Sequence, residues 1–356
     1  MTDWSLPTLA IGEFAPQFQA PTRVNPKFYF STLAGRYVLL GFVPAEAGLR
    51  AAALAAFEQV RPRLDDARFT AFLVVGETPE ASALQDQTPG QRWFFDPHGE
   101  VRALFGADEA APAWFLFDPA LRLLASARLD GFALLAERIQ TLPPLTQRAG
   151  VALTAPVAII PRIFEPEFCR QLIDHYDGEG GQLSGVMRDV GGRTVGVMDA
   201  MKRRRDVEIT DPTLRQDVVR RLERRLIPMV RRAFQFTATR LERYLVACYD
   251  AEEGGFFKPH RDNETFGAAH RRFAVSINLN AEDFTGGDLR FPEFGPRTYR
   301  PPTGGAVVFC CSLQHDATAV TAGRRYAFLP FLYDEAGQAI REQNQALLDS
   351  GPPQQA

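Results

Sequence analysis

The residues best suited to chemistry are His260 and Asp262, in the spacing His-x-Asp, and a distant His315. On a β-strand, residues i and i+2 point to the same face, so we expect His260 and Asp262 to bind one metal ion together. His315 must then arrive from another strand. Two histidines and one carboxylate are a ligand set for non-haem Fe(II) that leaves coordination positions open.

A cation follows the third candidate ligand. Residues 319–330 read AVTAGRRYAFLP, which predicts a turn at Gly323 and then a strand. An iron oxygenase that uses 2-oxoglutarate needs a fixed cation for the distal carboxylate of this cosubstrate. Arginine suits this task because its planar fork donates two parallel hydrogen bonds and stays charged. Strand alternation lets only one of Arg324 and Arg325 face a pocket.

The pattern His-x-Asp, a long gap, His, then Gly-x-Arg-Tyr resembles the prolyl-hydroxylase-like branch of the 2-oxoglutarate/Fe(II) dioxygenases, over residues 158–334. The resemblance implies that His260, Asp262 and His315 are the iron ligands and that Arg325, rather than Arg324, binds 2-oxoglutarate. It also implies that Tyr249 donates a hydrogen bond to the cosubstrate, although a packed core aromatic is a competing interpretation. Asn278 is a candidate second contact with 2-oxoglutarate.

The implied reaction is a hydroxylation. Fe(II) and 2-oxoglutarate are the implied cofactors, with ascorbate as a reductant, and O₂ oxidises an unactivated C–H bond while succinate and CO₂ are released. The substrate expected is a prolyl residue of a protein or an amino-acid-like small molecule. Two alternatives remain open. A hydrolytic zinc site is disfavoured because zinc prefers more histidine or thiolate ligands, and a metal-dependent binding or sensing protein would not need Arg325.

Short strands with Gly/Pro punctuation predict that residues 149–356 form a double-stranded β-helix, a jelly roll. In residues 272–280, apolar residues alternate with Ser276 and Asn278, as in a half-buried strand. Helices are expected from Pro166 and Pro212, and they should brace the barrel. Pro228 should kink or end the second of these. The Gly-rich segment 177–193 is either a lid over the site or a structural linker.

Residues 1–148 resemble the thioredoxin fold of peroxiredoxins, which implies an α/β sheet. The run Phe69–Val75 predicts a buried parallel strand, and the resemblance implies a cis peptide before Pro112. However, no cysteine precedes Cys169, so we expect no peroxidase or disulfide-exchange activity. A scaffold, a surface for homodimerisation or a substrate-recruiting arm is expected instead.

Composition is typical of a soluble two-domain enzyme, with 46% hydrophobic residues and a net charge of −3. The four cysteines show no framework spacing, Met1–Ser5 lacks a signal-peptide pattern, and no segment is apolar enough to span a membrane, which predicts a cytoplasmic protein. The charge run Lys202–Arg205 is interpreted as a solvated loop, and a nucleic-acid partner is disfavoured. An open alternative is that the run borders the mouth of the site and selects an acidic substrate. His270, Arg271 and Arg272 are expected to be structural.

Overall fold

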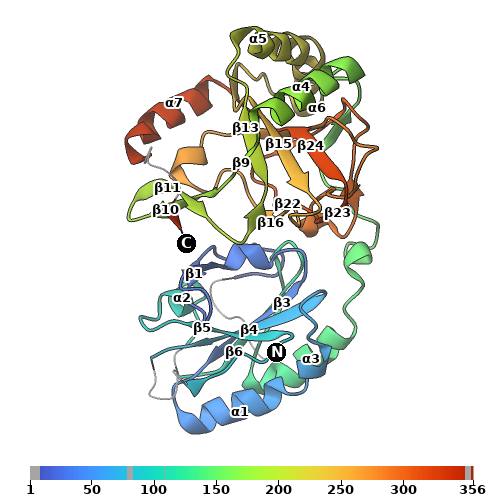
Figure 1. Cartoon of the computed structure of the whole chain (residues 1–356). Coiled ribbons are helices and arrows are strands. Elements are labelled where there is room, and N and C mark those ends of the chain that lie inside the picture. The colour runs from blue at the N-terminus through green and yellow to red at the C-terminus, as the bar shows by residue number, and fades with distance from the viewer. Residues whose placement is uncertain (1–8, 78–82, 109, 349–353, 356) are drawn as a thin grey trace. The chain divides into compact units, whose positions relative to one another are not determined.

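The computed structural model describes residues 9–77, 83–108, 110–348 and 354–355. The chain divides into two compact units, which Figure 1 shows as ribbons. The first consists of residues 1–154 with 292–296, and the second of residues 155–291 with 297–356. The domain boundary expected between residues 148 and 149 stays a prediction. Met1–Ser5, used above to argue against a signal peptide, lies outside the described residues.

The first unit is built on a five-stranded sheet in the order β5-β4-β3-β6-β7. Strands β3 (Tyr37–Val43), β4 (Phe69–Val75) and β5 (Gln91–Phe95) run parallel to one another, and β6 (Ala113–Phe117) and β7 (Leu123–Arg128) pair antiparallel. Every residue of β3 and β4 is buried, as expected for strands covered on both faces. The buried parallel strand predicted at Phe69–Val75 is therefore confirmed.

Two apolar layers cover this sheet. On one face, α1 (Ala47–Phe57) and α3 (Phe132–Gln140) pack around Trp114 and Leu39. On the other, α2 (Glu100–Leu104) and the following Phe105 pack on Val38, Leu40 and Phe42. A two-stranded sheet of β1 (Gln19–Ala20) and β2 (Phe28–Tyr29) adds Ala20 and Phe28 to this second layer. The α/β character expected from the sequence is present.

A carboxylate caps the helix that follows β3. After β3, Glu46 caps α1 and accepts hydrogen bonds from the backbone nitrogens of Gly48 (2.8 Å) and Leu49 (2.6 Å). These bonds, that of Leu49 above all, hold the pKa of Glu46 below its ordinary value. The prediction of a cis peptide before Pro112 is wrong. The cis bond among the described residues is Thr88–Pro89, whereas Pro112 leads directly into the extended β6.

The second unit contains two large antiparallel sheets. The path of the nine-stranded sheet is β14-β25-β17-β24-β15-β13-β9, with β21 and β8 paired beside β17. Its strands are β8 (Ala158–Ile160), β9 (Gln182–Leu183), β13 (Arg205–Glu208), β14 (Arg240–Glu242), β15 (Leu245–Asp250), β17 (Phe273–Asn278), β21 (Ala306–Cys310), β24 (Arg324–Phe328) and β25 (Phe331–Tyr333).

The five-stranded sheet has the order β12-β16-β22-β19-β20. Its strands are β12 (Lys202–Arg203), β16 (Phe256–His260), β19 (Leu289–Arg290), β20 (Thr298–Tyr299) and β22 (His315–Ala317). In two smaller sheets, β18 (Thr285–Gly286) pairs with β23 (Val320–Ala322), and β11 (Arg193–Met198) pairs with both β10 (Val186–Val190) and β26 (Gln354–Gln355). The double-stranded β-helix goes beyond these pairings and stays a prediction.

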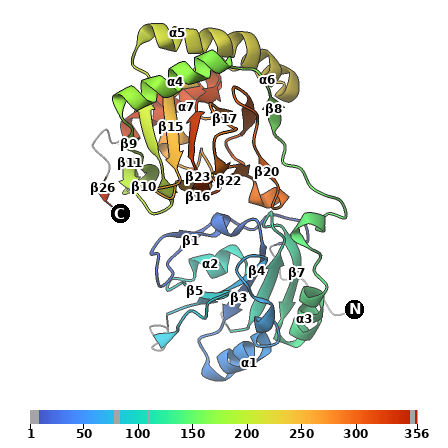
Figure 2. The same ribbon diagram turned by 45° about the vertical axis from the view of Figure 1, so that its right-hand side comes forward.

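Helices cover one face of the nine-stranded sheet (Figure 2). They are α4 (Pro166–Glu179), α5 (Pro212–Arg221) and α6 (Ile227–Phe234), and they bury Phe168, Leu172, Val218 and Val230 against strand residues such as Val275. A π-helical turn at Leu222–Leu226 joins α5 to α6 just ahead of Pro228, which explains the predicted break because proline has no N–H for the helical ladder. The helices expected from Pro166 and Pro212, and their packing on the strands, are therefore confirmed.

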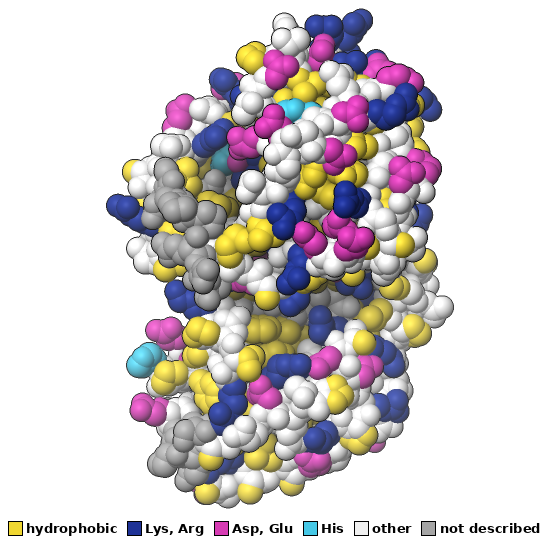
Figure 3. Space-filling view, viewed as in Figure 1, with side chains coloured by type: hydrophobic (Ala, Val, Ile, Leu, Met, Phe, Trp, Pro, Cys, Tyr) yellow, Lys and Arg dark blue, Asp and Glu magenta, His cyan; other side chains and the backbone are white. Residues whose placement is uncertain are grey.

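Two further segments complete the second unit. The Gly-rich segment 177–193 forms the end of α4 and strands β9 and β10, so it is not an irregular linker, and its role as a lid stays a prediction. Helix α7 (Glu335–Asn344) follows β25. Lys and Arg side chains are interspersed with Asp and Glu on the face shown in Figure 3. Among the described residues, no helix has the length and apolar content needed to cross a membrane.

Candidate metal centre

The three candidate ligands meet where β16 pairs with β22. His260 ends β16, His315 begins β22, and the two residues are cross-strand partners. Asp262 lies in a turn beyond the strand, and its backbone nitrogen donates a hydrogen bond to the carbonyl of Cys311 (3.0 Å). The strand-alternation argument for Asp262 is therefore wrong in its detail, because it is this turn that directs the carboxylate toward the histidines.

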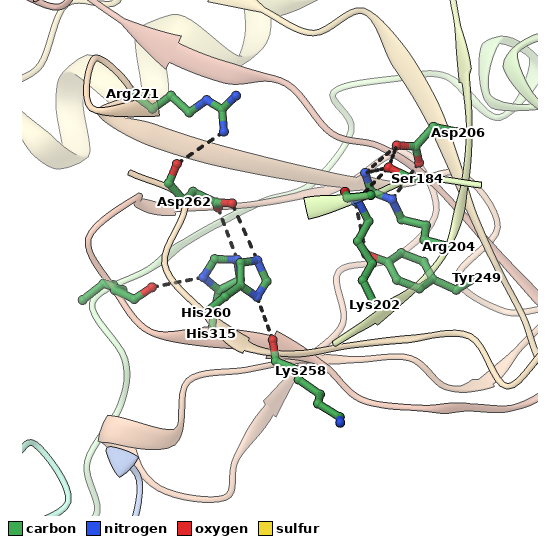
Figure 4. Close-up of polar contacts among 12 residues, drawn as sticks. Ser184, Lys202, Arg204, Asp206, Tyr249, Lys258, His260, Asp262, Arg271 and His315 are labelled. Carbon is green, nitrogen blue, oxygen red and sulfur yellow. Dashed lines mark hydrogen bonds and ion pairs between the residues drawn. The ribbon is translucent and has the colours of Figure 1, made fainter. Parts of the chain in front are cut away.

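The ligand atoms of His260, Asp262 and His315 lie within 4.8 Å of one another. Nε2 of His260 is 3.6 Å from Oδ1 of Asp262, and Nε2 of His315 is 3.3 Å from Oδ2 (Figure 4). Within the described ranges, these residues form the one group of three or more His, Cys, Asp or Glu side chains close enough to share a metal ion. The donor set fits iron in particular, because two imidazoles and one carboxylate leave room for further ligands.

Backbone carbonyls fix the tautomers of both imidazoles. Nδ1 of His260 lies 2.8 Å from the carbonyl of Lys258, and Nδ1 of His315 lies 3.0 Å from that of Leu313 (Figure 4). A carbonyl only accepts, so each Nδ1 carries the proton, and a neutral ring then has its lone pair on Nε2. Each Nε2 faces Asp262, as a metal-binding histidine requires.

The three ligands also perturb one another electrostatically. Burial opposes the charged form of Asp262, but the neighbouring His315 and His260 hold the pKa of Asp262 well below its ordinary value. Burial and the adjacent His315 lower the pKa of His260. Burial alone would also lower the pKa of His315, yet Asp262 outweighs it and raises this pKa. These shifts favour the carboxylate form of Asp262 and the neutral form of His260, which are the forms that bind a metal ion.

Arg325 lies in the same pocket with one donor unused. Its side chain lines the pocket with the three ligands and is 2% exposed. Nη2 donates to Oγ of Ser276 (2.8 Å) and Nε to Oδ1 of Asn278 (3.3 Å), whereas the buried Nη1 has no partner among the described residues. Burial lowers the pKa of Arg325. A buried cation with an open donor is a fitting site for a carboxylate.

Arg324 points the other way, because neighbouring residues on β24 alternate in direction. Its guanidinium is exposed and pairs with Asp250 (2.8 Å). The Gly286-Gly287 turn makes room for Arg325. Both glycines have positive φ, and a Cβ on Gly287 would lie 3.2 Å from Cδ of Arg325.

Tyr249 is the cross-strand partner of Arg325, and its buried ring lies between two guanidiniums. The Cζ atoms of Arg325 and Arg204 are 5.2 and 5.8 Å from the ring centroid. The Tyr249 hydroxyl accepts a hydrogen bond from Nη1 of Arg204 (3.4 Å). Asn278 is placed differently from the expectation. Its amide donates to the carbonyl of Pro301 (3.0 Å) and it holds Arg325, so it positions the guanidinium and does not line the pocket.

The interpretation of Lys202–Arg205 as a solvated loop is wrong. Lys202 and Arg203 form β12, and Arg205 begins β13. The Arg204 side chain is 4% exposed, lines the metal pocket and pairs with Asp206 through two 2.6 Å bonds (Figure 4). Lys202 donates to Ser184 (2.6 Å) and to the Gly185 carbonyl (2.7 Å), and burial holds its pKa well below the ordinary value.

The sequence interpretation also missed Arg243, Ser276 and Phe257, which line the pocket as well. Period-two alternation could have pointed to Ser276, because it places this residue on the face of its strand opposite the apolar residues. The same alternation places Arg204 on the same side of its extended segment as Lys202. The sequence carries no comparable signal for Arg243.

His270 and Arg271 bind a shared carboxylate, Glu242, next to the turn that carries Asp262. Glu242 accepts from Nε2 of His270 (2.7 Å) and from Nη2 and Nε of Arg271 (2.7 and 3.0 Å). Arg271 also donates to the backbone carbonyl of Asp262 (3.3 Å; Figure 4). These contacts confirm the structural role expected for both residues, and they tie the turn that carries Asp262 to the sheet.

The comparisons with known proteins match this region. Residues 244–333, which include the three ligands and Arg325, match the family described as the 2OG-Fe(II) oxygenase superfamily. The chain is similar to a prolyl hydroxylase from Trichoplax adhaerens, solved with a peptide of hypoxia inducible factor, with 18% identity, 52% of this chain and 87% of that chain covered, and a TM-score of 0.42. The chain is also similar to a prolyl-4-hydroxylase from Pseudomonas putida, with 16% identity, 51% of this chain and 93% of that chain covered, and a TM-score of 0.38.

Another similarity is to a putative thiol:disulfide interchange protein from Chlorobium tepidum, with 23% identity, 36% of this chain and 99% of that chain covered, and a TM-score of 0.31. No curated protein matches the sequence.

Proposed function

We propose that the chain is a dioxygenase, because residues 244–333 match the 2OG-Fe(II) oxygenase superfamily, and that it uses O₂ to hydroxylate an unactivated C–H bond while 2-oxoglutarate is converted to succinate and CO₂. His260, Asp262 and His315 hold Fe(II), and Arg325 binds the distal carboxylate of 2-oxoglutarate. One observation supports the proposal most strongly. The ligand atoms of His260, Asp262 and His315 lie within 4.8 Å of one another, and the same pocket contains the buried Arg325, whose Nη1 has no hydrogen-bond partner among the described residues.

The chain's own residues bind and orient the cosubstrate. Ser276 and Asn278 hold the Arg325 fork in place, so its free Nη1 is directed before 2-oxoglutarate arrives. The Tyr249 hydroxyl accepts from Arg204, which leaves its own proton free to donate to a carboxylate oxygen. Burial of the pocket strengthens both contacts. Iron, when bound, supplies the activation of O₂ and the oxidation of the substrate.

The substrate is a prolyl residue of a protein or an amino-acid-like molecule, the two classes to which the sequence motifs point. Ascorbate serves as the reductant that keeps iron ferrous. The strand-rich second unit completes a double-stranded β-helix around the site. The first unit takes no part in thiol chemistry and acts as a scaffold, a dimerisation surface or a substrate-recruiting arm. A protein that only binds metal would have no use for the open donor of Arg325.

The proposal is tested by turnover without added substrate. The full chain, with Fe(II), ascorbate and 2-oxoglutarate, is expected to form succinate slowly and only when O₂ is present. His315→Ala should abolish succinate formation, and His98→Ala, a change at an exposed histidine of the first unit, should preserve it. Absence of succinate with iron-loaded wild-type protein, or equal rates in His315→Ala, would contradict the proposal and favour a metal-dependent binding or sensing protein.

A further inference from the structure

Arg243 is a cation of the metal pocket that the proposed reaction leaves unused. It lies between β14 and β15 and lines the pocket together with the three ligands. Its guanidinium makes no hydrogen bond and no ion pair with any residue that the structure describes. The Cζ atom of Arg243 lies 5.4 Å from the centroid of the Phe331 ring.

The carboxylates that act on Arg243 are already engaged by other groups. Asp206 and Glu242 are the two acidic side chains whose charge favours the Arg243 cation. Asp206 accepts hydrogen bonds from Nε and Nη2 of Arg204, and Glu242 accepts from Arg271 and His270. Arg243 forms an ion pair with neither carboxylate, so its donors are available to a ligand.

The placement of Arg243 costs free energy. Its φ of +68° lies in the left-handed region, which residues other than glycine rarely adopt. Burial, followed by repulsion from Arg271 and Arg204, lowers the pKa of Arg243 to about 10. Strained and electrostatically disfavoured residues cluster at functional sites, where a ligand supplies the missing contact.

A charge count of the loaded pocket leaves Arg243 without a counter-ion. Divalent iron with Asp262 carries one positive charge, Arg325 adds a second, and the 2-oxoglutarate dianion balances both. Arg204 and Asp206 neutralise each other. Lys202 does not line this pocket and donates instead to Ser184 and to the Gly185 carbonyl. The charge of Arg243 therefore remains for the substrate.

We propose that Arg243 binds a carboxylate of the substrate, so that the enzyme acts on a free amino acid or a related small carboxylic acid. The inference rests on the proposed function and chooses between its two substrate classes. A residue within a polypeptide presents amides in place of an α-carboxylate, whereas a free amino acid presents the carboxylate that a guanidinium binds bidentately. Arg243 is thus a specificity-determining residue, distinct from the cosubstrate arginine.

The test uses the smallest matched probes, N-acetylglycine and its neutral amide N-acetylglycinamide. Each is titrated calorimetrically into the full chain loaded with Mn(II) and saturating 2-oxoglutarate, which occupies Arg325. The wild-type protein should bind the acid at least about tenfold more tightly than the amide, the ratio expected for one charge-assisted hydrogen bond. Arg243→Gln should abolish this preference, and Arg203→Gln, on the exposed side of β12, should retain it.

Arg243→Lys keeps the positive charge and should retain part of the preference for the acid, which controls for a disturbed fold. Equal binding of acid and amide by the wild-type protein would overturn the proposal, as would an unchanged preference in Arg243→Gln. Weaker 2-oxoglutarate binding in Arg243→Gln would also overturn it, because Arg243 would then serve the cosubstrate. Failure of the wild-type protein to bind 2-oxoglutarate would instead contradict the proposed function itself.

Discussion

Replacement of Arg325 by glutamine should weaken 2-oxoglutarate binding about a hundredfold. The Arg325 side chain is 2% exposed, and its Nη1 has no partner until a ligand supplies one. A hydrogen bond to a charged group contributes about 1.5–3 kcal/mol. Loss of this bond together with the charge of the fork should therefore cost about 3 kcal/mol, which corresponds to roughly a hundredfold in Kd.

The same substitution should have little effect on folding. Arg325 is a buried cation without an ion-pair partner among the described residues, so the protein free of 2-oxoglutarate already carries a desolvation cost that Arg325→Gln removes. The new amide can still bond to Ser276 or Asn278, which now hold the guanidinium. We expect the melting temperature of the 2-oxoglutarate-free protein to be equal to that of wild type or higher.

Calorimetric titration of 2-oxoglutarate into the Mn(II)-loaded protein measures the effect. Arg324→Gln is the matched control, because it removes the neighbouring arginine of the same strand. The Arg324 side chain is 55% exposed and its ion pair with Asp250 is a surface pair, so the control should stay within about twofold of wild type. Unchanged affinity in Arg325→Gln, or a loss in Arg324→Gln, would refute the assignment of the cosubstrate arginine.

Three further outcomes are expected. Glu242→Gln should lower the free energy of unfolding by about 3 kcal/mol at neutral pH, because it leaves Arg271 buried without its anion. Burial alone would raise the pKa of Glu242, but His270 and Arg271 outweigh it and hold this pKa below its ordinary value. The stability difference between wild type and Glu242→Gln should therefore shrink as the pH falls below about 4.3. Urea unfolding at several pH values measures this change. Tyr249→Phe should raise the Kd for 2-oxoglutarate less than about tenfold in calorimetric titration, the effect of one hydrogen bond, and a larger or absent effect would contradict this contact. The full chain should show no thiol-dependent peroxide reduction, because no cysteine precedes Cys169, and any such activity would contradict this expectation.

The sequence predicted the parts of the site that depend on local spacing. His260 and Asp262 are close in the chain, and Arg325 follows a glycine turn, so their types and intervals carry information. The apolar alternation of residues 273–279 correctly separated the core face from Ser276 and Asn278. Burial of the long helices was predictable for the same reason, since period and composition are local properties.

The rest of the pocket depends on contacts between distant strands. Arg204 reaches Tyr249 across the pairing of β13 with β15, so a run of four basic residues was mistaken for a solvated surface. Arg243 needs a left-handed backbone that its residue type does not indicate. Asp262 lies in a turn held by Cys311 and Arg271, and neither contact is visible in the His-x-Asp spacing.

The most direct test of the central claim is an anaerobic titration of 2-oxoglutarate into the Fe(II)-loaded full chain, followed in the visible range. We expect a saturable charge-transfer band from the iron chelate, absent in His260→Ala, whose site retains two of the three ligands. His98→Ala should give the wild-type band. If folded, iron-loaded wild-type protein shows no band, or if His260→Ala shows the same band, the pocket around His260, Asp262 and His315 is not a 2-oxoglutarate-dependent iron site.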